Sequence, residues 1–423
     1  MDISRRKFSA LLAASAGGVL MPRIGRAGLT GERKFLFVFC RGGWDTTYVF
    51  TPLLDHPSII PEPGDELAMA AGIPFVHNNS RPSVTAFFEE YASRACVING
   101  LEVRSVTHER CRQLVMTGSS SGGDDWPSLL ASHSIDTRLI PHIVVAGPAY
   151  TARYTGSVVR VGDSGQLPDL LDGAAILNAE LPVALPPPGV ESLTDAFMAQ
   201  RLASRAEQPD TSQRGRYLSQ YAESLQRSDL LAPYTEQLDL TSKLGCRRDN
   251  VADAGIIFDM FELGLARCGM IEDNGSCSAG WDTHEGNRMQ DWHYEELFAS
   301  LSGIMAELDS RPGEYSDRLA DEVTIVVFSE MGRHPLLNSK GGKEHWTYTS
   351  AMLLGAGVRG GQSLGGLDSN GLGLPIDLVT GAASSSGTAL TSTSLGATLL
   401  AMGDMDPSEF LFDVQPISAA LSL

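Results

Sequence analysis

Two segments in the C-terminal half of the chain contain side chains of the kinds that bind metals. Asp282 and His284 stand two residues apart in the run Gly-Trp-Asp-Thr-His. Glu330 follows an uncharged apolar run, and His345 comes fifteen residues after it. Carboxylate and imidazole are the ligand types that zinc, manganese and iron share. On an extended chain Asp282 and His284 would project to the same side, so one cation could accept both.

Each of these residues also has an ordinary structural explanation. Aspartate is common in turns and at the beginning of helices. Glu330, at the end of a buried run, must be ion-paired, hydrogen-bonded or metal-bound, and Arg333 is close enough in the sequence to neutralise it. His345 lies in a glycine-rich polar loop, where a surface histidine is common. The metal-site interpretation therefore depends on these side chains meeting in space.

An acid near the N-terminus repeats the pattern. Asp45 ends the run Arg-Gly-Gly-Trp-Asp, which directly follows an apolar stretch. A strand end followed by a glycine-containing loop is where open α/β sheets collect their ligands. We therefore predict a site for one or more divalent ions, with zinc or manganese as the expected metal. The predicted metal ligands are Asp45, Asp282, His284, Glu330 and His345.

Thr107 and His108 open a predicted helix and are the predicted catalytic residues. A hydroxyl in this place is usually an N-cap, and that explanation stays open. The same place offers backbone N–H groups and the positive end of the helix dipole to an anion. A nearby metal would lower the pKa of the Thr107 hydroxyl and make it a nucleophile. His108 is a candidate ligand or acid/base, and a purely structural histidine is the alternative.

The elements that must position these residues alternate along the chain. Strand-like apolar runs occupy residues 34–40, 95–101, 141–146, 269–271, 323–328 and 351–355. Helical patterns occupy residues 83–92, 108–116, 253–266, 289–309 and 391–401. This alternation predicts an α/β fold with a mostly parallel, doubly wound sheet between helices.

The ends of the sequence and its middle suggest the domain organisation. A paired arginine, Arg5-Arg6, precedes a mildly apolar stretch, which is typical of a twin-arginine export signal over residues 1–28. The stretch is too short and too polar to span a bilayer, so we expect export through the Tat translocase to the periplasm or outside, with no stable membrane anchor. Residues 29–423 would form one large domain with a helical insertion at about 181–249.

Charge and motif content exclude several function classes. The formal net charge is −19; the first 27 residues hold five basic and one acidic residue, so the rest carries 27 basic and 50 acidic residues, or −23. Binding to nucleic acid or to an anionic membrane needs clustered Lys and Arg, so we expect neither. The sequence contains no P-loop, no G-x-G-x-x-G after a strand, no G-x-S-x-G and no H-E-x-x-H.

The six cysteines form no C-x-x-C pair. Cys268 with Cys277, and Cys96 with Cys111, are the closest pairs in the sequence. Outside the cytoplasm some of them could form disulfides, and buried free thiols are the equally open alternative.

Taken together, these motifs resemble the exported bacterial family catalogued as domain of unknown function 1501. They are the twin-arginine signal, Arg-Gly-Gly-Trp-Asp after the first strand, Thr-His at a helix start, Gly-Trp-Asp-Thr-His, and Ser-Glu-Met-Gly-Arg followed by Lys-Glu-His-Trp. The similarity covers most of the chain after the signal and is least clear across residues 181–249. That family looks related to the alkaline phosphatase and sulfatase superfamily, which implies an alkaline-phosphatase-like fold with a metal site at the C-terminal ends of the strands.

The resemblance also implies roles for individual residues. Asp45 corresponds to the first-strand metal acid and Thr107 to the nucleophile. Asp282 and His284 resemble the acid and histidine of one metal position, with His345 as its distal histidine. Glu330 falls where the superfamily has the acid of an Asp-His pair. The sequence departs from the family pattern directly after Glu330.

Met331 stands where the superfamily has a histidine, which leaves the second metal position in doubt and makes His108 or His334 the candidates to compensate. No Cys-x-Pro-x-Arg motif is present, which argues against a formylglycine sulfatase. Arg41, Arg104 and Arg333 are the candidate arginines to hold the anionic group.

The sequence thus predicts an exported, metal-dependent hydrolase of a small anionic ester, a phosphate or a sulfate, with Thr107 as the nucleophile. The alternative is a degenerate, non-catalytic member that binds a ligand or a protein in the same cleft. In a third possibility the acids and histidines are purely structural, and Asp282→Ala would then lower stability without changing the metal content.

Overall fold

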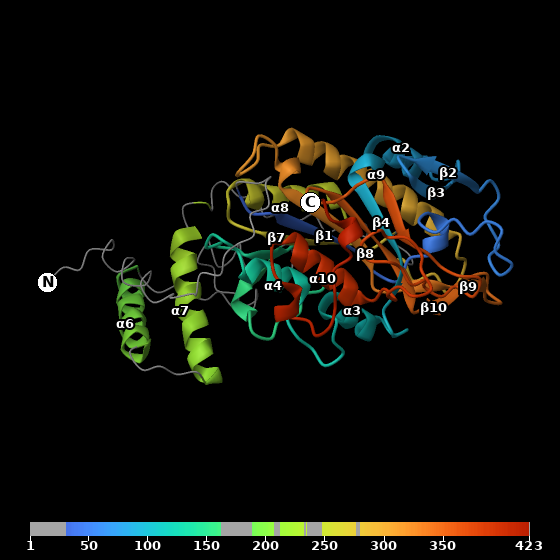
Figure 1. Cartoon of the computed structure of the whole chain (residues 1–423). Helices are drawn as coiled ribbons and strands as arrows, with labels where there is room; N and C mark the ends of the chain where they lie inside the picture. Colours follow the sequence, from blue (N-terminus) through green and yellow to red (C-terminus); the bar gives the residue numbers. More distant parts are fainter. Residues whose placement is uncertain are drawn as a thin grey trace. The chain divides into compact units, whose positions relative to one another are not determined.

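The computed structural model describes residues 31–161, 188–206, 212–231, 234, 248–275 and 280–422. These residues belong to one compact unit, Gly31–Leu423 (Figure 1). The predicted export signal lies outside the described residues.

An eight-stranded sheet forms the centre of the described structure. Its order is β12 (Gln362–Gly365), β4 (Ala95–Glu102), β11 (Tyr348–Gly355), β8 (Val323–Ser329), β1 (Lys34–Cys40), β7 (Cys268–Asp273), β5 (His142–Val144) and β6 (Val158–Arg160). The neighbouring strands pair in parallel except at β11, which runs antiparallel to both β4 and β8. A mostly parallel sheet of this kind needs apolar cover on both faces.

Helices supply that cover on both sides of the sheet (Figure 1). The sequence of β1, Lys-Phe-Leu-Phe-Val-Phe-Cys, is buried throughout, and successive side chains point to opposite faces. Leu36 and Val38 face the layer of α2 (Pro82–Tyr91), α8 (Asn250–Glu262) and α9 (Met289–Ser310). Phe35 and Phe37 face the layer of α3 (His108–Thr117), α4 (Trp126–Ser132) and α10 (Ser392–Met402). The predicted α/β fold, with a mostly parallel sheet between helices, is confirmed.

Several short elements were not predicted. Two small hairpins, β2 (Glu66–Ala70) with β3 (Ile73–His77) and β9 (Gly332–Leu337) with β10 (Lys343–Trp346), stand apart from the main sheet. Their strands are short and carry charged or exposed residues, so they lack the continuous apolar runs of the central strands. Short 3-10 turns complete the described structure at Thr46–Tyr48, Ala92–Arg94, Thr155–Ser157, Leu319–Asp321, Pro407–Glu409 and Ser418–Ala420.

The described part of the predicted helical insertion consists of α6 (Pro188–Ala206) and α7 (Gln213–Leu231). Across the described ranges, no helix combines the length and the apolar character needed to cross a bilayer. Cys40, Cys96, Cys111 and Cys268 are buried free thiols, which agrees with the second of the two cysteine interpretations. Cys246 and Cys277 lie outside the described residues.

Candidate metal centre

The predicted site residues leave the sheet at one edge, where the parallel strands end. Glu330 follows β8, Asp282 lies in the segment after β7, and His108 begins α3 after β4. His345 reaches the same edge by a different route. Because β11 is antiparallel, its first residue, Tyr348, pairs with the last residue of β4, and the β9–β10 hairpin that precedes it carries His345 there.

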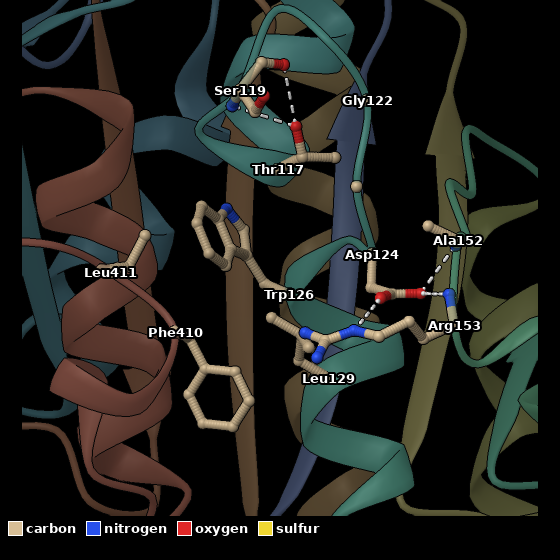
Figure 2. A pocket seen from close by; sticks show the side chains of 11 residues that line it. Thr117, Ser119, Gly122, Asp124, Trp126, Leu129, Ala152, Arg153, Phe410 and Leu411 are labelled. Atoms are coloured by element: carbon tan, nitrogen blue, oxygen red, sulfur yellow. Dashed lines mark hydrogen bonds and ion pairs between the residues drawn. The ribbon is translucent and has the colours of Figure 1, made fainter. Parts of the chain in front are cut away.

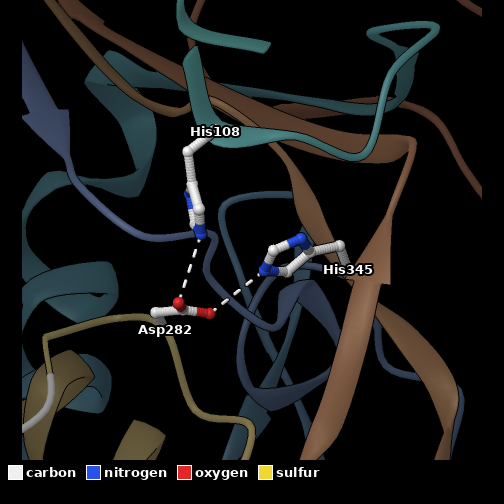
Figure 3. A group of neighbouring side chains, drawn as sticks. All are labelled: His108, Asp282 and His345. Carbon is white, nitrogen blue, oxygen red and sulfur yellow. Dashed lines mark hydrogen bonds and ion pairs between the residues drawn. The ribbon is translucent and has the colours of Figure 1, made fainter. Parts of the chain in front are cut away.

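Three imidazoles converge on the Asp282 carboxylate, and Figure 3 shows two of them, those of His108 and His345. His108 Nε2 lies 3.2 Å from Oδ2. His345 Nε2 and His284 Nε2 each lie 3.2 Å from Oδ1, and these two nitrogens are 2.9 Å apart. The Asp282 side chain is 38% exposed, so the cluster is open to solvent on one side.

The opposite ring nitrogen of each histidine is bonded outward. His108 Nδ1 lies 2.9 Å from Glu330 Oε1, His345 Nδ1 lies 2.7 Å from the carbonyl oxygen of Val106, and His284 Nδ1 lies 3.0 Å from Glu344 Oε2. Carboxylates and carbonyls only accept hydrogen bonds, so each Nδ1 carries a proton and donates it. The Nε2 atom of each ring therefore faces the cluster as a lone pair when the ring is neutral and as an N–H donor to Asp282 when the ring is protonated.

Such an inward arrangement of lone pairs requires protons or a cation between them, and its chemistry fits a metal ion. Metal-binding histidines usually donate their other ring nitrogen to a carboxylate or a carbonyl, as all three do here. Ligand atoms about 2.1 Å from a tetrahedral zinc ion lie roughly 3.4 Å apart, close to the separations in the cluster. His108, Asp282 and His345 offer ligand atoms that all lie within 4.8 Å of one another. Imidazole-rich sets favour zinc over manganese.

The cluster also changes the pKa of its members. Hydrogen bonds to Asp282 and then to Glu330 raise the pKa of His108 to about 9. Burial by itself would raise the pKa of Asp282, but hydrogen bonds from His108, His345 and Arg333 outweigh it and hold that pKa far below its usual value. These donors keep Asp282 ionised, as a carboxylate that binds a metal must be.

Arg333 is part of the frame of the site and does not pair with Glu330, as one interpretation of the sequence had suggested. Its Nη2 donates to Asp282 Oδ1 at 2.6 Å, its Nε donates to Gly43 O at 2.8 Å, and it also donates to the carbonyl oxygen of Gly42. The side chain is fully buried. Arg333 therefore holds the segments after β1 and β7 together and has no exposed face for a substrate anion.

The other two candidate arginines are also paired. Arg41 lies 3.1 Å from Glu272, and Arg104 lies 3.4 Å from Glu102. Arg104 has a positive φ of 62° and a mostly exposed side chain. Neither pair ties its arginine to the cluster.

Asp45 lies in a separate set of contacts. Its Oδ2 is 2.6 Å from Lys343 Nζ and accepts from Asn287 at 2.8 Å, while its Oδ1 accepts from the backbone and hydroxyl of Thr47. Burial alone would raise the pKa of Asp45, and the charge of Lys343 overrides this and lowers it. The described contacts pair Asp45 with Lys343 and include none between Asp45 and the histidine cluster.

Thr107 stands at the beginning of α3 but does not cap it. Its side chain is exposed and makes no hydrogen bond to the first turn, so the N-cap explanation does not hold. Its hydroxyl lies 3.4 Å from the hydroxyl of Ser105. The first N–H groups of a helix have no partner within the helix, and here the cap side chain leaves them available.

Residues that the sequence analysis did not single out complete the site. Glu344 and the carbonyl of Val106 orient two of the histidines, and Lys343 neutralises Asp45. Lys343 and Glu344 directly precede His345, so a charged pair beside a candidate ligand was the available signal.

A separate hollow of about 240 Å³ lies beside α3 and α4 and holds none of the predicted site residues (Figure 2). Its most polar wall is Asp124, whose Oδ1 accepts from the backbone of Ala152, Arg153 and Tyr154. That carboxylate fixes a loop. The hollow is lined by Thr117, Ser119, Gly122, Gly123, Asp124, Trp126, Leu129, Ala152, Arg153, Phe410 and Leu411. The candidate metal-binding side chains therefore lie at the sheet edge and not in this hollow.

Comparison with known proteins identifies the family of this chain. The family model described as "Protein of unknown function (DUF1501)" matches residues 32–375. Among curated proteins, none matches the chain.

Three solved structures are among those with some similarity to this chain. Ps i-CgsB in complex with k-i-k-neocarrahexaose has a TM-score of 0.41 and 9% identity, over 91% of this chain and 75% of that chain. The PsFucS1 sulfatase from Pseudoalteromonas sp. has a TM-score of 0.39 and 10% identity, over 92% and 72%. The phosphonate monoester hydrolase SpPMH from Silicibacter pomeroyi has a TM-score of 0.36 and 12% identity, over 92% and 78%. All three TM-scores are below 0.5, so these similarities carry no conclusion about this chain.

Proposed function

This chain belongs to the DUF1501 family, and we propose that it is an exported, metal-dependent hydrolase of phosphate or sulfate esters. The observation that carries the proposal is the convergence of His108, His284 and His345 on Asp282, with all three outward nitrogens bonded to acceptors. When the rings are neutral, three lone pairs face one carboxylate, and this arrangement needs protons or a cation between them. A divalent ion would supply that charge for all three rings at once.

His108, Asp282, His284 and His345 would hold the ion, with zinc as the expected metal and manganese as the alternative. A divalent cation bound there would stabilise negative charge on the oxygens of the ester. His108 was also predicted as an acid/base, and its position favours the ligand role, because its Nε2 faces Asp282 and its Nδ1 is bonded to Glu330.

Thr107 would supply the nucleophile. Its exposed hydroxyl is adjacent in sequence to a ligand, and Ser105 lies close enough to orient it. Thr107 Oγ1 would form a bond to phosphorus or sulfur as the bond to the ester oxygen breaks, with the hydroxyl proton passing to the leaving alcohol. Water would then cleave the threonine ester, releasing phosphate or sulfate and restoring the hydroxyl. The first N–H groups of α3 would hold the anionic oxygens during attack.

Metal analysis and turnover of an aryl phosphate and an aryl sulfate by the purified protein, without the signal, would test this function. We expect a bound metal and hydrolysis that chelation removes. Thr107→Val should abolish hydrolysis with the metal content unchanged, whereas Thr107→Ser, which keeps a hydroxyl, should retain part of it. Equal turnover by the valine and serine variants would contradict the role of Thr107.

A second candidate function, ligand binding without catalysis, has specific support. Met331 stands where the superfamily has a histidine, and it is buried against Val103 and Cys111. Arg333 is buried in the frame of the site and leaves no exposed guanidinium for an ester anion. A folded protein that retains a metal but hydrolyses neither ester would favour this candidate over the enzyme.

Export to the periplasm or beyond is part of the proposal and depends on the N-terminal sequence. Replacing Arg5 and Arg6 by lysine should leave the uncleaved protein in the cytoplasm, detected by fractionation and immunoblotting. Continued export of this variant would contradict a twin-arginine route.

A further inference from the structure

We infer that Glu330 is a positioning residue that holds two ligand-bearing segments in place and does not itself bind metal, so that the site takes one divalent ion per chain. This inference rests on the metal site of the proposed function. The sequence suggested that Glu330 is a metal ligand, whereas this inference makes it an orienting partner of a ligand. It also sets the number of bound ions at one.

The contacts of Glu330 engage both oxygens of its carboxylate with protein donors, inside the fold. Oε1 accepts from His108 Nδ1 at 2.9 Å and from Gly42 N at 3.0 Å. Oε2 accepts from Gly42 N at 3.1 Å and lies 3.1 Å from the hydroxyl of Ser329. These contacts come from three donors, because the one N–H of Gly42 is shared between both oxygens, and the Ser329 hydroxyl also lies 2.7 Å from the carbonyl oxygen of Cys40. The side chain is fully buried, and it meets His108 on the ring edge turned away from Asp282.

The hydrogen bond between Glu330 and Gly42 also helps to fix the position of the segment that carries Asp282. Gly42 has a φ of +126°, and a Cβ there would lie 2.7 Å from the backbone nitrogen of Asp282. The loop after β1 therefore packs directly against the backbone of that ligand. The Glu330 carboxylate accepts a hydrogen bond from the N–H of Gly42, and Arg333 donates one to the carbonyl oxygen of Gly42. One buried carboxylate thus fixes both the His108 ring and the wall behind Asp282.

Donors for a second ion are not available around this cluster in the described part of the chain. Met331, next to Glu330, packs in a small apolar cluster. Asp45 is neutralised by Lys343 at 2.6 Å. The residues that could hold an ion within the described ranges form one group, His108, Asp282 and His345, beside which His284 lies. These side chains can form a binding position for one metal ion.

The inference makes a quantitative statement about metal affinity. Removing the partner that orients a metal-binding histidine typically weakens metal binding 10- to 100-fold without removing the site. Loss of a true ligand to a second ion would instead reduce the number of bound ions. Affinity and stoichiometry therefore distinguish the two roles of Glu330.

The experiment is a titration of the metal-free protein, without the signal, with Co²⁺ and Zn²⁺, followed by calorimetry and by the visible absorption of bound Co²⁺. We expect one ion per chain in the wild type. Glu330→Gln, whose amide oxygen can still accept from His108 and Gly42, should bind one ion about 10- to 100-fold more weakly, with a shifted cobalt spectrum. Glu272→Gln is the matched control, because it removes a carboxylate at the end of β7 that pairs with Arg41 and bonds to no ligand.

The control should bind the ion as tightly as the wild type. Two ions in the wild type and one in Glu330→Gln would overturn the inference, and so would equal affinity in those two proteins. The wild-type stoichiometry decides between the two roles even if Glu330→Gln does not fold. A wild type that binds no ion would overturn the proposed function together with this inference, whereas equal affinity in Glu330→Gln would leave the proposed function intact.

Discussion

Buried charge gathers at both ends of the central strands, and the two clusters are built differently. At the N-terminal end, Lys34 at the start of β1 lies 2.5 Å from Glu322 and 3.0 Å from Glu314. Arg138 and Arg267 complete this network by pairing with Glu32. At the C-terminal end, Asp282 and Glu330 meet three histidines and one arginine.

The difference lies in what neutralises the acids. The three glutamates at the N-terminal end are matched by one lysine and two arginines, whose charges are permanent at physiological pH. At the C-terminal end most of the partners are imidazoles, whose charge depends on a proton or on a metal. A balanced, buried network stabilises a fold, whereas a set of convergent lone pairs, partly open to solvent, is suited to bind a cation. The two ends of the strands thus differ in chemistry: one acid cluster is suited to a stable fold and the other to binding a cation.

The largest effect that separates the two ends is expected from Lys34→Met. It keeps the apolar stem but leaves Glu322 buried without its cation, which typically costs about 3–5 kcal/mol. Urea unfolding should show this loss, while the affinity for Co²⁺ of the folded protein should not change. A fall in metal affinity would mean that the two ends are coupled and that the comparison is wrong.

Asp282→Ala should weaken metal binding more than it lowers stability, which is the reverse of the result for Lys34→Met. It removes the carboxylate on which the three histidines converge, so metal binding should weaken by more than about 100-fold, beyond what loss of an orienting partner causes. His334→Ala is the control, because His334 packs against Trp346 and lies outside the cluster. Lower stability with an unchanged metal content would support the purely structural explanation of the acids and histidines.

The N-terminal end also contains an imidazole, and it should make the fold sensitive to acid. His142 begins β5 beside the start of β7, and neither of its ring nitrogens has a hydrogen-bond partner among the described residues. Burial, with the nearby Arg160, lowers the pKa of His142 to about 3. The unfolded chain, with a histidine pKa near 6.5, binds the proton first, so stability is complete above about pH 6.5 and is lost as the pH falls toward 3.

Replacing this histidine tests that prediction. His142→Phe should remove a pH dependence of up to about 1.4 kcal/mol per pH unit from unfolding measured between pH 6.5 and 4. The Lys34→Met variant should keep this slope. If the slope is the same in His142→Phe and in the wild type, the acid sensitivity originates elsewhere.

The smallest effect is expected within the metal end itself. Glu344 orients His284 as Glu330 orients His108, but it is exposed, with 61% of its side chain accessible, whereas Glu330 is buried. Water can replace an exposed acceptor, so Glu344→Gln should weaken Co²⁺ binding by about tenfold or less. A larger loss than in Glu330→Gln would show that burial does not rank the two orienting acids.

The sequence alone determined the elements and where the ligand candidates leave them. The apolar runs placed β1, β4, β8 and β11 within about three residues of their observed bounds, because a strand buried on both faces requires a continuous apolar sequence. The acids and histidines after those runs had to gather at one sheet edge, since parallel strands end together. The pair formed by Asp282 and His284 could be recognised from the sequence because its two side chains are close neighbours along the chain.

Only the tertiary structure decided which partner each charged group has. Glu330 bonds to His108, 222 residues away, and Arg333 bonds to Asp282, 51 residues away, although Glu330 and Arg333 are three residues apart. Asp45, predicted from the sequence as a metal ligand, forms an ion pair with Lys343. Thr107 is the first residue before α3, but its side chain makes no capping hydrogen bond. Local patterns encode the conformation of the backbone, whereas the pairing of charges depends on which side chains the folded sheet brings together in a common buried space.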